Sequence, residues 1–475
     1  MDYELIYHII KTAEEISETA HNILSEPKDF KRLSSMANLA TPLKIHDVFF
    51  KVLAHIYRLA DEAGEEDVKR RAKEVLLKMV KNIHAPIAIL GAIEEGEKLR
   101  SIEGEVAIPN GNISYIPYVI LDPSEGLVTV LYFDENEDLI ISEPIPLGED
   151  PKNKEILRNL IVSTVIPMGA VVGRRRVAEG SRISLYESVK RLMGKSYDKI
   201  SEIIGEPILR RYKKDGKGYI IPIGMSHVLP REAFVQEYYE EELGEFVPIS
   251  RPVLFKPKKF RGVGNLSVLL HGTRRRWIRE FEIKSLIKLI KEELKRLGRR
   301  EVDLSGLNPE EVAIALKKYL NEGKNIILIS HVSSDLRADY KYKIVVPNEK
   351  TERGYVEIFI DEIMRATQVY ERGLAIIFGC LGAAAVPLSG TMGIESVDRS
   401  VSVSLTLAAK GYKYTVGTVR ESIDKYFDEF YSEFLRRVVL EEEDPVVALS
   451  RVKYERYEEG ERFMRPLPVI YEIPV

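Results

Sequence analysis

From residue 264 onward, short apolar runs alternate with amphipathic helical patterns, and this alternation constrains the fold more than any other feature. The apolar runs are too short to form buried helices, while the segments between them repeat apolar residues at helical spacing. Six runs are interpreted as strands: 266–270, 301–304, 325–330, 374–378, 412–419 and 468–474. Helical patterns cover 281–297, 309–320, 401–409 and 423–439. Strands that alternate with helices predict an α/β fold, in which a mostly parallel sheet carries helices on both faces.

One segment between the third and fourth of these strands departs from the alternation. Residues 342–360 contain two short apolar runs around Pro347-Asn348 and Arg353-Gly354. Because such dipeptides are typical of turns, the segment is predicted to be an antiparallel hairpin that projects from the sheet.

The first 260 residues follow a different pattern. Helical spacing predicts one helix that ends before Pro27 and two more near 43–63 and 66–82. Strands are then predicted at 106–121, 127–133 and 219–223, and helical patterns lie between the last two of these. The predicted organisation is therefore an N-terminal helical region (1–104), a β-containing part (105–262) with a helical insertion at about 125–245, and an α/β domain (263–475).

Composition narrows the classes of function. The formal net charge is −4, from 70 basic and 74 acidic residues, which gives no general attraction to nucleic acid or to an anionic membrane. No apolar run approaches the ~18 residues that cross a bilayer, and the N-terminus lacks the pattern of a signal peptide. We therefore expect a cytoplasmic protein without membrane association. The 30% of charged residues would suit a thermophile.

Two reactive side chains are predicted at one edge of the sheet, where functional groups of open parallel sheets collect. His331 follows the third strand and Cys380, the only cysteine, follows the fourth. A nucleophilic cysteine needs a nearby base or cation, because a free thiol with a pKa of about 8.5 is mostly protonated at neutral pH. Judged by position alone, each residue is more often structural, since a cysteine after an apolar strand is usually buried in the core.

Several segments, in chain order, carry a resemblance to a known family. They read VAIPNGNISYIPYVIL, NIILISH, VEIFIDEIMRA…GLAIIFGC, GIESVDRSVSVSLTLAAKGYKYTVGTV, FYSEFL and DPVVALSRVK. This series, over about 105–124 and 246–475, resembles the CHAT peptidases, which are relatives of caspases, separases and gingipains. The resemblance implies a caspase-like fold and a cysteine peptidase that cleaves protein or peptide substrates. It also implies Cys380 as nucleophile, His331 as base, and no metal or cofactor. Backbone N–H groups of Val332 and Cys380 would then form the oxyanion site.

The departures from the family pattern leave other functions open. Val332 stands where the family usually has glycine, and Arg420 stands where a tryptophan is common. The first departure favours a second candidate, a catalytically silent CHAT-like scaffold that binds partners. A basic stretch at 274–300 would suit a nucleotide- or nucleic-acid-binding protein, but the phosphate-binding glycine motifs are missing and nucleic acid is therefore an unexpected partner.

His271-Gly272 carries the His-Gly dipeptide of caspases, but it ends the first predicted strand. In a caspase-like sheet the third strand lies beside the strand that carries the cysteine, so His331 is the preferred base. His271, Arg274 and Arg420 are candidates for substrate binding, since a guanidinium can bind a carboxylate through two hydrogen bonds. Such arginines are more often solvated or ion-paired.

The insertion raises a question of regulation. One hypothesis places it, together with the N-terminal helices, near the mouth of the cleft, where it would respond to a regulatory protein partner or to cleavage. The alternative is that it forms a larger wall of the domain. A weaker idea treats Arg174-Arg175-Arg176 as a processing loop.

Overall fold

The computed structural model describes most of the chain. The described residues are 2–25, 36–83, 93–95, 98–100, 103–122, 125–155, 157, 190–223, 235–236, 239, 243–258, 262–272, 299–335, 341–359, 363, 366–378, 386–387, 400–401, 403–418, 424–458 and 468–474. The helix expected at 281–297 and the proposed processing loop at 174–176 lie outside them. Among the described residues, no helix is both long and apolar enough to cross a membrane.

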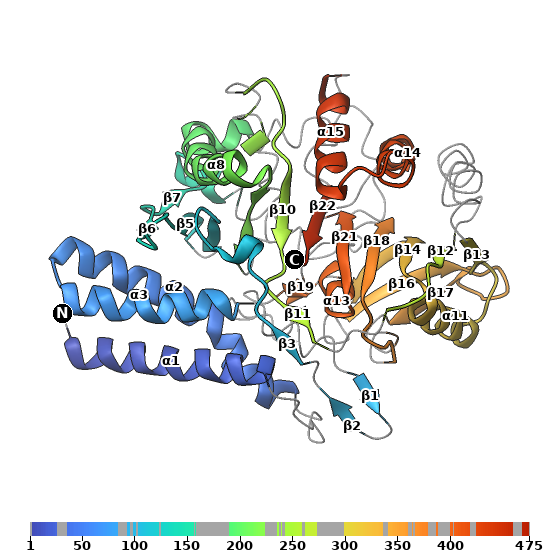
Figure 1. The fold of residues 1–475 in the computed structure, drawn as a ribbon, viewed down its shortest axis with the longest axis horizontal. Helices are drawn as coiled ribbons and strands as arrows, with labels where there is room; N and C mark the ends of the chain where they lie inside the picture. Colours follow the sequence, from blue (N-terminus) through green and yellow to red (C-terminus); the bar gives the residue numbers. More distant parts are fainter. Residues whose placement is uncertain are drawn as a thin grey trace.

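A large eight-stranded sheet forms the centre of the C-terminal half (Figure 1). Its strands, in spatial order, are β13 (Arg299–Asp303), β12 (Ser267–His271), β14 (Asn325–Ile329), β18 (Arg372–Phe378), β21 (Tyr412–Thr418), β22 (Pro468–Glu472), β10 (Ile249–Pro252) and β8 (Gly218–Tyr219). The first five are parallel, β22 is antiparallel to β21, and β10 and β8 continue parallel to β22. The six strands predicted outside the hairpin of this half all belong to this sheet.

Alternate residues of the central strands enter two different cores. Leu270, Leu328 and Ile377 pack on the face covered by α11 (Pro309–Glu322) and α13 (Val403–Ala409). The intervening residues, Leu269, Ile327 and Ile376, pack on the face covered by α14 (Asp424–Leu440) and α15 (Pro445–Glu458). Since successive side chains of a strand point to opposite faces, strands that are apolar on both faces require two helical layers. The prediction of an α/β fold with helices on both faces is confirmed.

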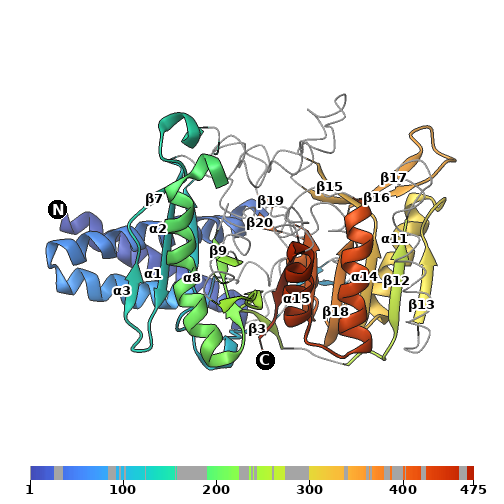
Figure 2. The ribbon, with the colours of Figure 1, turned by 90° about the horizontal axis from the view of Figure 1, so that it is seen from above.

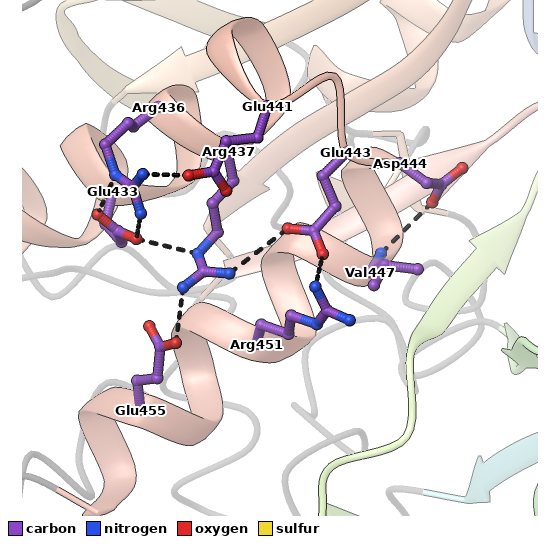
Figure 3. Close-up of polar contacts among 9 residues, drawn as sticks. All are labelled: Glu433, Arg436, Arg437, Glu441, Glu443, Asp444, Val447, Arg451 and Glu455. Carbon is purple, nitrogen blue, oxygen red and sulfur yellow. Dashed lines mark hydrogen bonds and ion pairs between the residues drawn. The ribbon is translucent and has the colours of Figure 1, made fainter.

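The helices α14 and α15 are joined by a network of ion pairs (Figure 3). Arg437 lies at its centre, with Glu433 at 3.0 Å, Glu443 at 3.6 Å and Glu455 of α15 at 2.6 Å. The Arg437 side chain is 14% exposed. Because salt and water screen such a buried charge less than a surface charge, the network contributes to holding the two helices together on the sheet.

A small three-stranded antiparallel sheet projects from the end of β14 (Figure 2). It consists of β15 (His331–Asp335), β16 (Lys341–Pro347) and β17 (Tyr355–Phe359). The hairpin predicted at 342–360 is confirmed as β16 and β17. β14 ends at Ile329, one residue earlier than predicted, and His331, which was predicted to follow this strand, is the first residue of β15.

A second, smaller sheet lies between two helical layers in the N-terminal half (Figures 1 and 2). Its strands are β6 (Leu139–Ile141), β5 (Leu127–Phe133), β4 (Tyr118–Asp122) and β9 (Ile221–Ile223), with β7 (Ile145–Pro146) beside β5. Helices α1 (Tyr3–Ser25), α2 (Met36–Ala63) and α3 (Glu66–Lys81) share one core with this sheet, and α8 (Lys195–Asp215) packs on the other face. The N-terminal helices are therefore one wall of a sheet that belongs to the following region.

The described part of the insertion connects the two sheets. After α8, the strands β8 and β9 are separated by one residue, Ile220, yet β8 pairs with β10 in the large sheet and β9 pairs with β4 in the smaller one. The single strand predicted at 219–223 is thus divided between two sheets. Three strands of the large sheet, β21, β22 and β10, lie between β8 of the insertion and the strands β14 and β18.

The strand predicted at 106–121 is correct only in its last residues, where β4 begins at Tyr118. Before it lies a 3₁₀ turn, η2 (Pro109–Gly111), in which Asn110 has a φ of 52° and Gly111 a φ of 66°. Asparagine and glycine adopt this left-handed backbone more easily than other residues, so the Pro-Asn-Gly sequence ends the extended chain here. Three further two-stranded pairs complete the described elements: β1 (Ile93–Glu95) with β2 (Lys98–Arg100), β3 (Gly104–Glu105) with β11 (Lys256–Pro257), and β19 (Val386–Pro387) with β20 (Ser400–Val401).

Candidate active site at the carboxyl edge of the large sheet

The strands that lead to the two candidate catalytic residues are neighbours. β14 and β18 are parallel, and the last residue of β14, Ile329, lies opposite the last residue of β18, Phe378. In each case the candidate residue, His331 or Cys380, follows two positions later in the sequence. The predicted adjacency of these strands is confirmed, and the two strands end at the same level.

The structure describes only part of the predicted site. The backbone of His331 lies in β15 opposite Val345 of β16. Cys380, Arg274 and Arg420 lie outside the described residues, so their predicted roles stay predictions. Within the described part of the chain, no group of three or more histidine, cysteine or acidic residues could hold a metal ion.

The backbone on either side of His331 is held by its contacts with β16. Ser330 Oγ donates a hydrogen bond to the carbonyl oxygen of Val345 at 2.9 Å. Val332 is 4% exposed and packs in the same core as Ile344 and Val346. Valine at position 332 therefore has a packing role in a strand, where β-branched side chains are favoured.

The tip of the hairpin is hydrogen-bonded to the loop that connects β13 with α11. Gly306 N–H donates to the carbonyl of Pro347 at 2.9 Å, and the Asn348 amide donates to the carbonyl of Leu307 at 2.6 Å. Residues 304–308 form the connection between β13 and α11. The hairpin is thus fixed near its tip by Ser330 and by the loop after β13.

His271, the other histidine at this edge, lies one strand further from the cysteine segment. It ends β12, and β14 separates β12 from β18. The side chain is buried against carboxylates of β13: Nε2 lies 3.1 Å from Glu301 Oε1, and Nδ1 lies 3.7 Å from Asp303 Oδ1. Spacing alone does not single out these two carboxylates, because their role becomes apparent only once β13 is known to be the partner of β12.

Two buried basic side chains hold the opposite, amino-terminal edge of the same strands. Arg372, the first residue of β18, donates to the carbonyls of Gly323 at 2.6 Å and of Lys410 at 3.3 Å, each of which directly follows a helix. Lys410 Nζ donates to the carbonyl of Thr367 at 2.8 Å. Carbonyls at helix C-termini lack partners within the helix and carry partial negative charge, which a buried cation offsets. Burial, followed by the nearby Arg372 charge, lowers the pKa of Lys410 to about 7.

Comparisons with known proteins give a limited result. No protein-family model matches the chain, and no curated protein matches it. Among solved structures, the chain is similar to crystal structures of the Saccharomyces cerevisiae separase–securin complex at 2.6 and 3.0 Å, with TM-scores of 0.45 and 0.47. The sequence identities are 10% and 11%, and each similarity covers 99% of this chain and 40% of the other. The chain thus spans about two fifths of the length of the proteins it resembles, and the assignment of the fold class rests on the strand order and layers described above.

Proposed function

We propose that the protein is a caspase-like cysteine peptidase, in which Cys380 is the nucleophile and His331 is the general base. The observation that carries the proposal is the register of β14 and β18, because Ile329 lies opposite Phe378 and each candidate residue follows two positions later. The strand order adds support, since β14 lies between β12 and β18 and therefore favours His331 over His271 as the base.

The proposed reaction is acyl transfer in two steps. The Cys380 thiolate attacks the carbonyl carbon of a peptide bond, and the C–N bond breaks as the protonated His331 ring gives its proton to the leaving amine. A water molecule then loses a proton to His331 and attacks the thioester, which releases the carboxylic acid and restores the thiolate. Each step moves one proton through His331, so both steps require the imidazole ring beside the thiol.

The developing oxyanion would be stabilised by the backbone N–H groups of Val332 and Cys380. One such donor contributes about 3 to 4 kcal/mol in comparable sites. The departure from glycine at Val332 is compatible with this role, because its side chain is buried in the hairpin core and a backbone donor does not depend on the side chain. Recognition of an acidic side chain by Arg274 or Arg420 is part of the proposal, as is control by a regulatory protein partner.

Because Cys380 is the only cysteine, labelling of the protein by a thiol-directed reagent measures the reactivity of the proposed nucleophile. A peptidyl alkylating inhibitor should label wild-type protein at Cys380, and Cys380→Ser should abolish both labelling and hydrolysis of an internally quenched peptide library. His331→Ala should slow labelling at pH 7 by at least about 100-fold, because general acid–base residues contribute on that scale.

Two outcomes would contradict the proposal in different ways. Equal labelling of wild type and His331→Ala, at the rate of a free thiol, would favour a catalytically silent scaffold. Labelling that persists in His331→Ala but disappears in His271→Ala would show that the wrong base was chosen.

A further inference from the structure

We infer that Gly272 positions His331, through simultaneous contacts with both chain segments that flank it. The inference rests on the proposed function, because it concerns the geometry of the proposed Cys380–His331 pair. Gly272 directly follows β12, and it does not need to be glycine for its backbone conformation, since its φ is not in the positive region.

The first contact is a hydrogen bond to β14. The Gly272 N–H donates to the carbonyl of Ile329 at 3.0 Å. Ile329 is the last residue of β14 and lies two positions before His331. Gly272 therefore fixes the point at which the chain leaves the large sheet toward the candidate base.

The second contact is a close approach to β16. A Cβ atom added to Gly272 would lie 2.9 Å from Cγ1 and 3.4 Å from Cγ2 of Val346, which leaves no space for a methyl group. Val346 follows Val345, the residue that lies opposite His331 in the hairpin. The absence of a side chain at Gly272 thus sets how closely the hairpin packs onto the large sheet.

Val346 cannot give way easily. It is fully buried and packs in one core with Ile344, Val356 and Ile358. The χ1 angle of a β-branched side chain is restricted, and a close-packed core leaves few alternative rotamers. An added methyl group at position 272 is therefore expected to displace β16, and with it the backbone of His331.

The position of Gly272 is fixed by the contacts that the preceding residue, His271, makes with Glu301 and Leu304. The carbonyl of the preceding residue, His271, accepts a hydrogen bond from Leu304 N–H at 2.7 Å, and its buried ring lies 3.1 Å from Glu301. Consecutive residues of a strand point to opposite faces, so His271 is anchored on β13 while position 272 opens toward the hairpin. The strain of a larger residue at 272 would consequently pass to the hairpin rather than to β12.

The experiment compares Gly272→Ala with a matched control, Gly264→Ala. Gly264 lies just before β12 in the same segment, and an added Cβ there would meet nothing within 4 Å.

The readout is the pH dependence of the alkylation of Cys380 by iodoacetamide in the whole chain. A correctly placed His331 keeps the thiol reactive below the free-thiol pKa of about 8.5, so Gly272→Ala should raise the midpoint toward that value. A rise of about one unit makes alkylation at pH 7 roughly tenfold slower. Gly264→Ala should leave the midpoint unchanged.

A second substitution separates positioning from general damage to the fold. Val346→Ala removes both γ-carbons that meet the added methyl group and leaves Val346 Cβ, which is 3.5 Å away and in ordinary contact distance. The double variant Gly272→Ala/Val346→Ala should therefore recover the wild-type midpoint. If Gly272→Ala alone does not fold, the double variant decides by itself: a wild-type midpoint supports the inference and a raised midpoint overturns it.

The outcomes also distinguish this inference from the proposed function. A raised midpoint in His331→Ala together with a wild-type midpoint in Gly272→Ala would overturn the positioning role and leave the peptidase proposal intact. The same midpoint in wild type and His331→Ala would show that no dyad exists, and both proposals would fail.

Discussion

Replacing Arg211 by methionine should destabilise the protein strongly, although an arginine on a helix is usually a surface residue. Arg211 lies in α8, and its side chain is 2% exposed. Its guanidinium donates to the carbonyls of Pro109 at 2.7 Å, Asn112 at 2.9 Å and Ser114 at 3.0 Å. It also forms an ion pair with Asp215, one turn further along the helix.

The expected loss follows from these contacts. Hydrogen bonds from a charged donor contribute about 1.5 to 3 kcal/mol each, and removal of one member of a buried ion pair costs about 3 to 5 kcal/mol. Contacts made by one side chain are not additive, so we expect Arg211→Met to lower the free energy of unfolding by about 4 to 6 kcal/mol. The carbonyls of Pro109, Asn112 and Ser114 would lose the guanidinium as a donor, and the carboxylate of Asp215, whose side chain is 10% exposed, would lose its charge partner.

Urea unfolding followed by far-ultraviolet circular dichroism measures this loss as a shift of the midpoint at constant slope. Arg210→Met is the matched control, because Arg210 is the preceding residue of the same helix and its side chain is 50% exposed. Its ion pair with Glu206 is a surface pair, worth at most about 1 kcal/mol. Free energies of unfolding of the two variants that agree within about 1 kcal/mol would refute the reasoning.

Arg211 belongs to the insertion and contacts the segment before β4. A large loss of stability in Arg211→Met would therefore favour the insertion as a wall of the fold over a detachable regulatory element.

Two further predictions concern other buried charges. The pKa of Lys410 is lowered to about 7, mainly by burial, while an unfolded lysine titrates near 10.4. Between these values the unfolded state binds more protons, so wild-type stability should rise with pH in this window, and Lys410→Met should flatten that rise. Thermal unfolding at pH 7 to 9.5 checks this, and equal slopes for both proteins would contradict it. Arg437→Leu should lower the free energy of unfolding by about 1 to 3 kcal/mol more than Arg436→Leu, because the Arg437 side chain is the less exposed of the two, at 14% against 39%. Urea unfolding measures this difference, and equal losses would argue against a special role for the network in Figure 3.

The regular alternation after residue 264 allowed most of the large sheet to be predicted, because strands that are buried on both faces have a distinctive continuous apolar sequence. Asn308 illustrates a local signal that was sufficient alone. Asparagine is a favoured N-cap residue and Asn308 directly precedes the helix predicted at 309–320; in the structure Asn308 and Glu311 form a capping box at the start of α11.

The elements that were missed depend on contacts between distant residues. The segment His331–Asp335 has a single aliphatic residue, Val332, and its strand character comes from pairing with β16. Arg211 looks like an ordinary charged helix residue until the Pro109 turn, about a hundred positions earlier, is placed against it. Propensity and spacing carry no information on such pairings, because tertiary contacts decide them.

The candidate site could be predicted to the level of its strands. The strand adjacency follows from the sheet, whereas the residues beyond the strand ends depend on tertiary contacts such as the pairing of β15 with β16, which periodicity does not specify. Cys380 and the arginines at 274 and 420 therefore remain predictions.

The distance between the sulfur of Cys380 and the imidazole ring of His331 tests the central claim most directly. A crystal structure of the protein, free and with a peptidyl inhibitor bound, would supply it. We expect the two groups to lie within about 7 Å in the free protein and to approach hydrogen-bonding distance in the complex, because catalytic contacts often tighten on binding. A thiol buried in the core and turned away from His331 in both structures would contradict the proposed dyad.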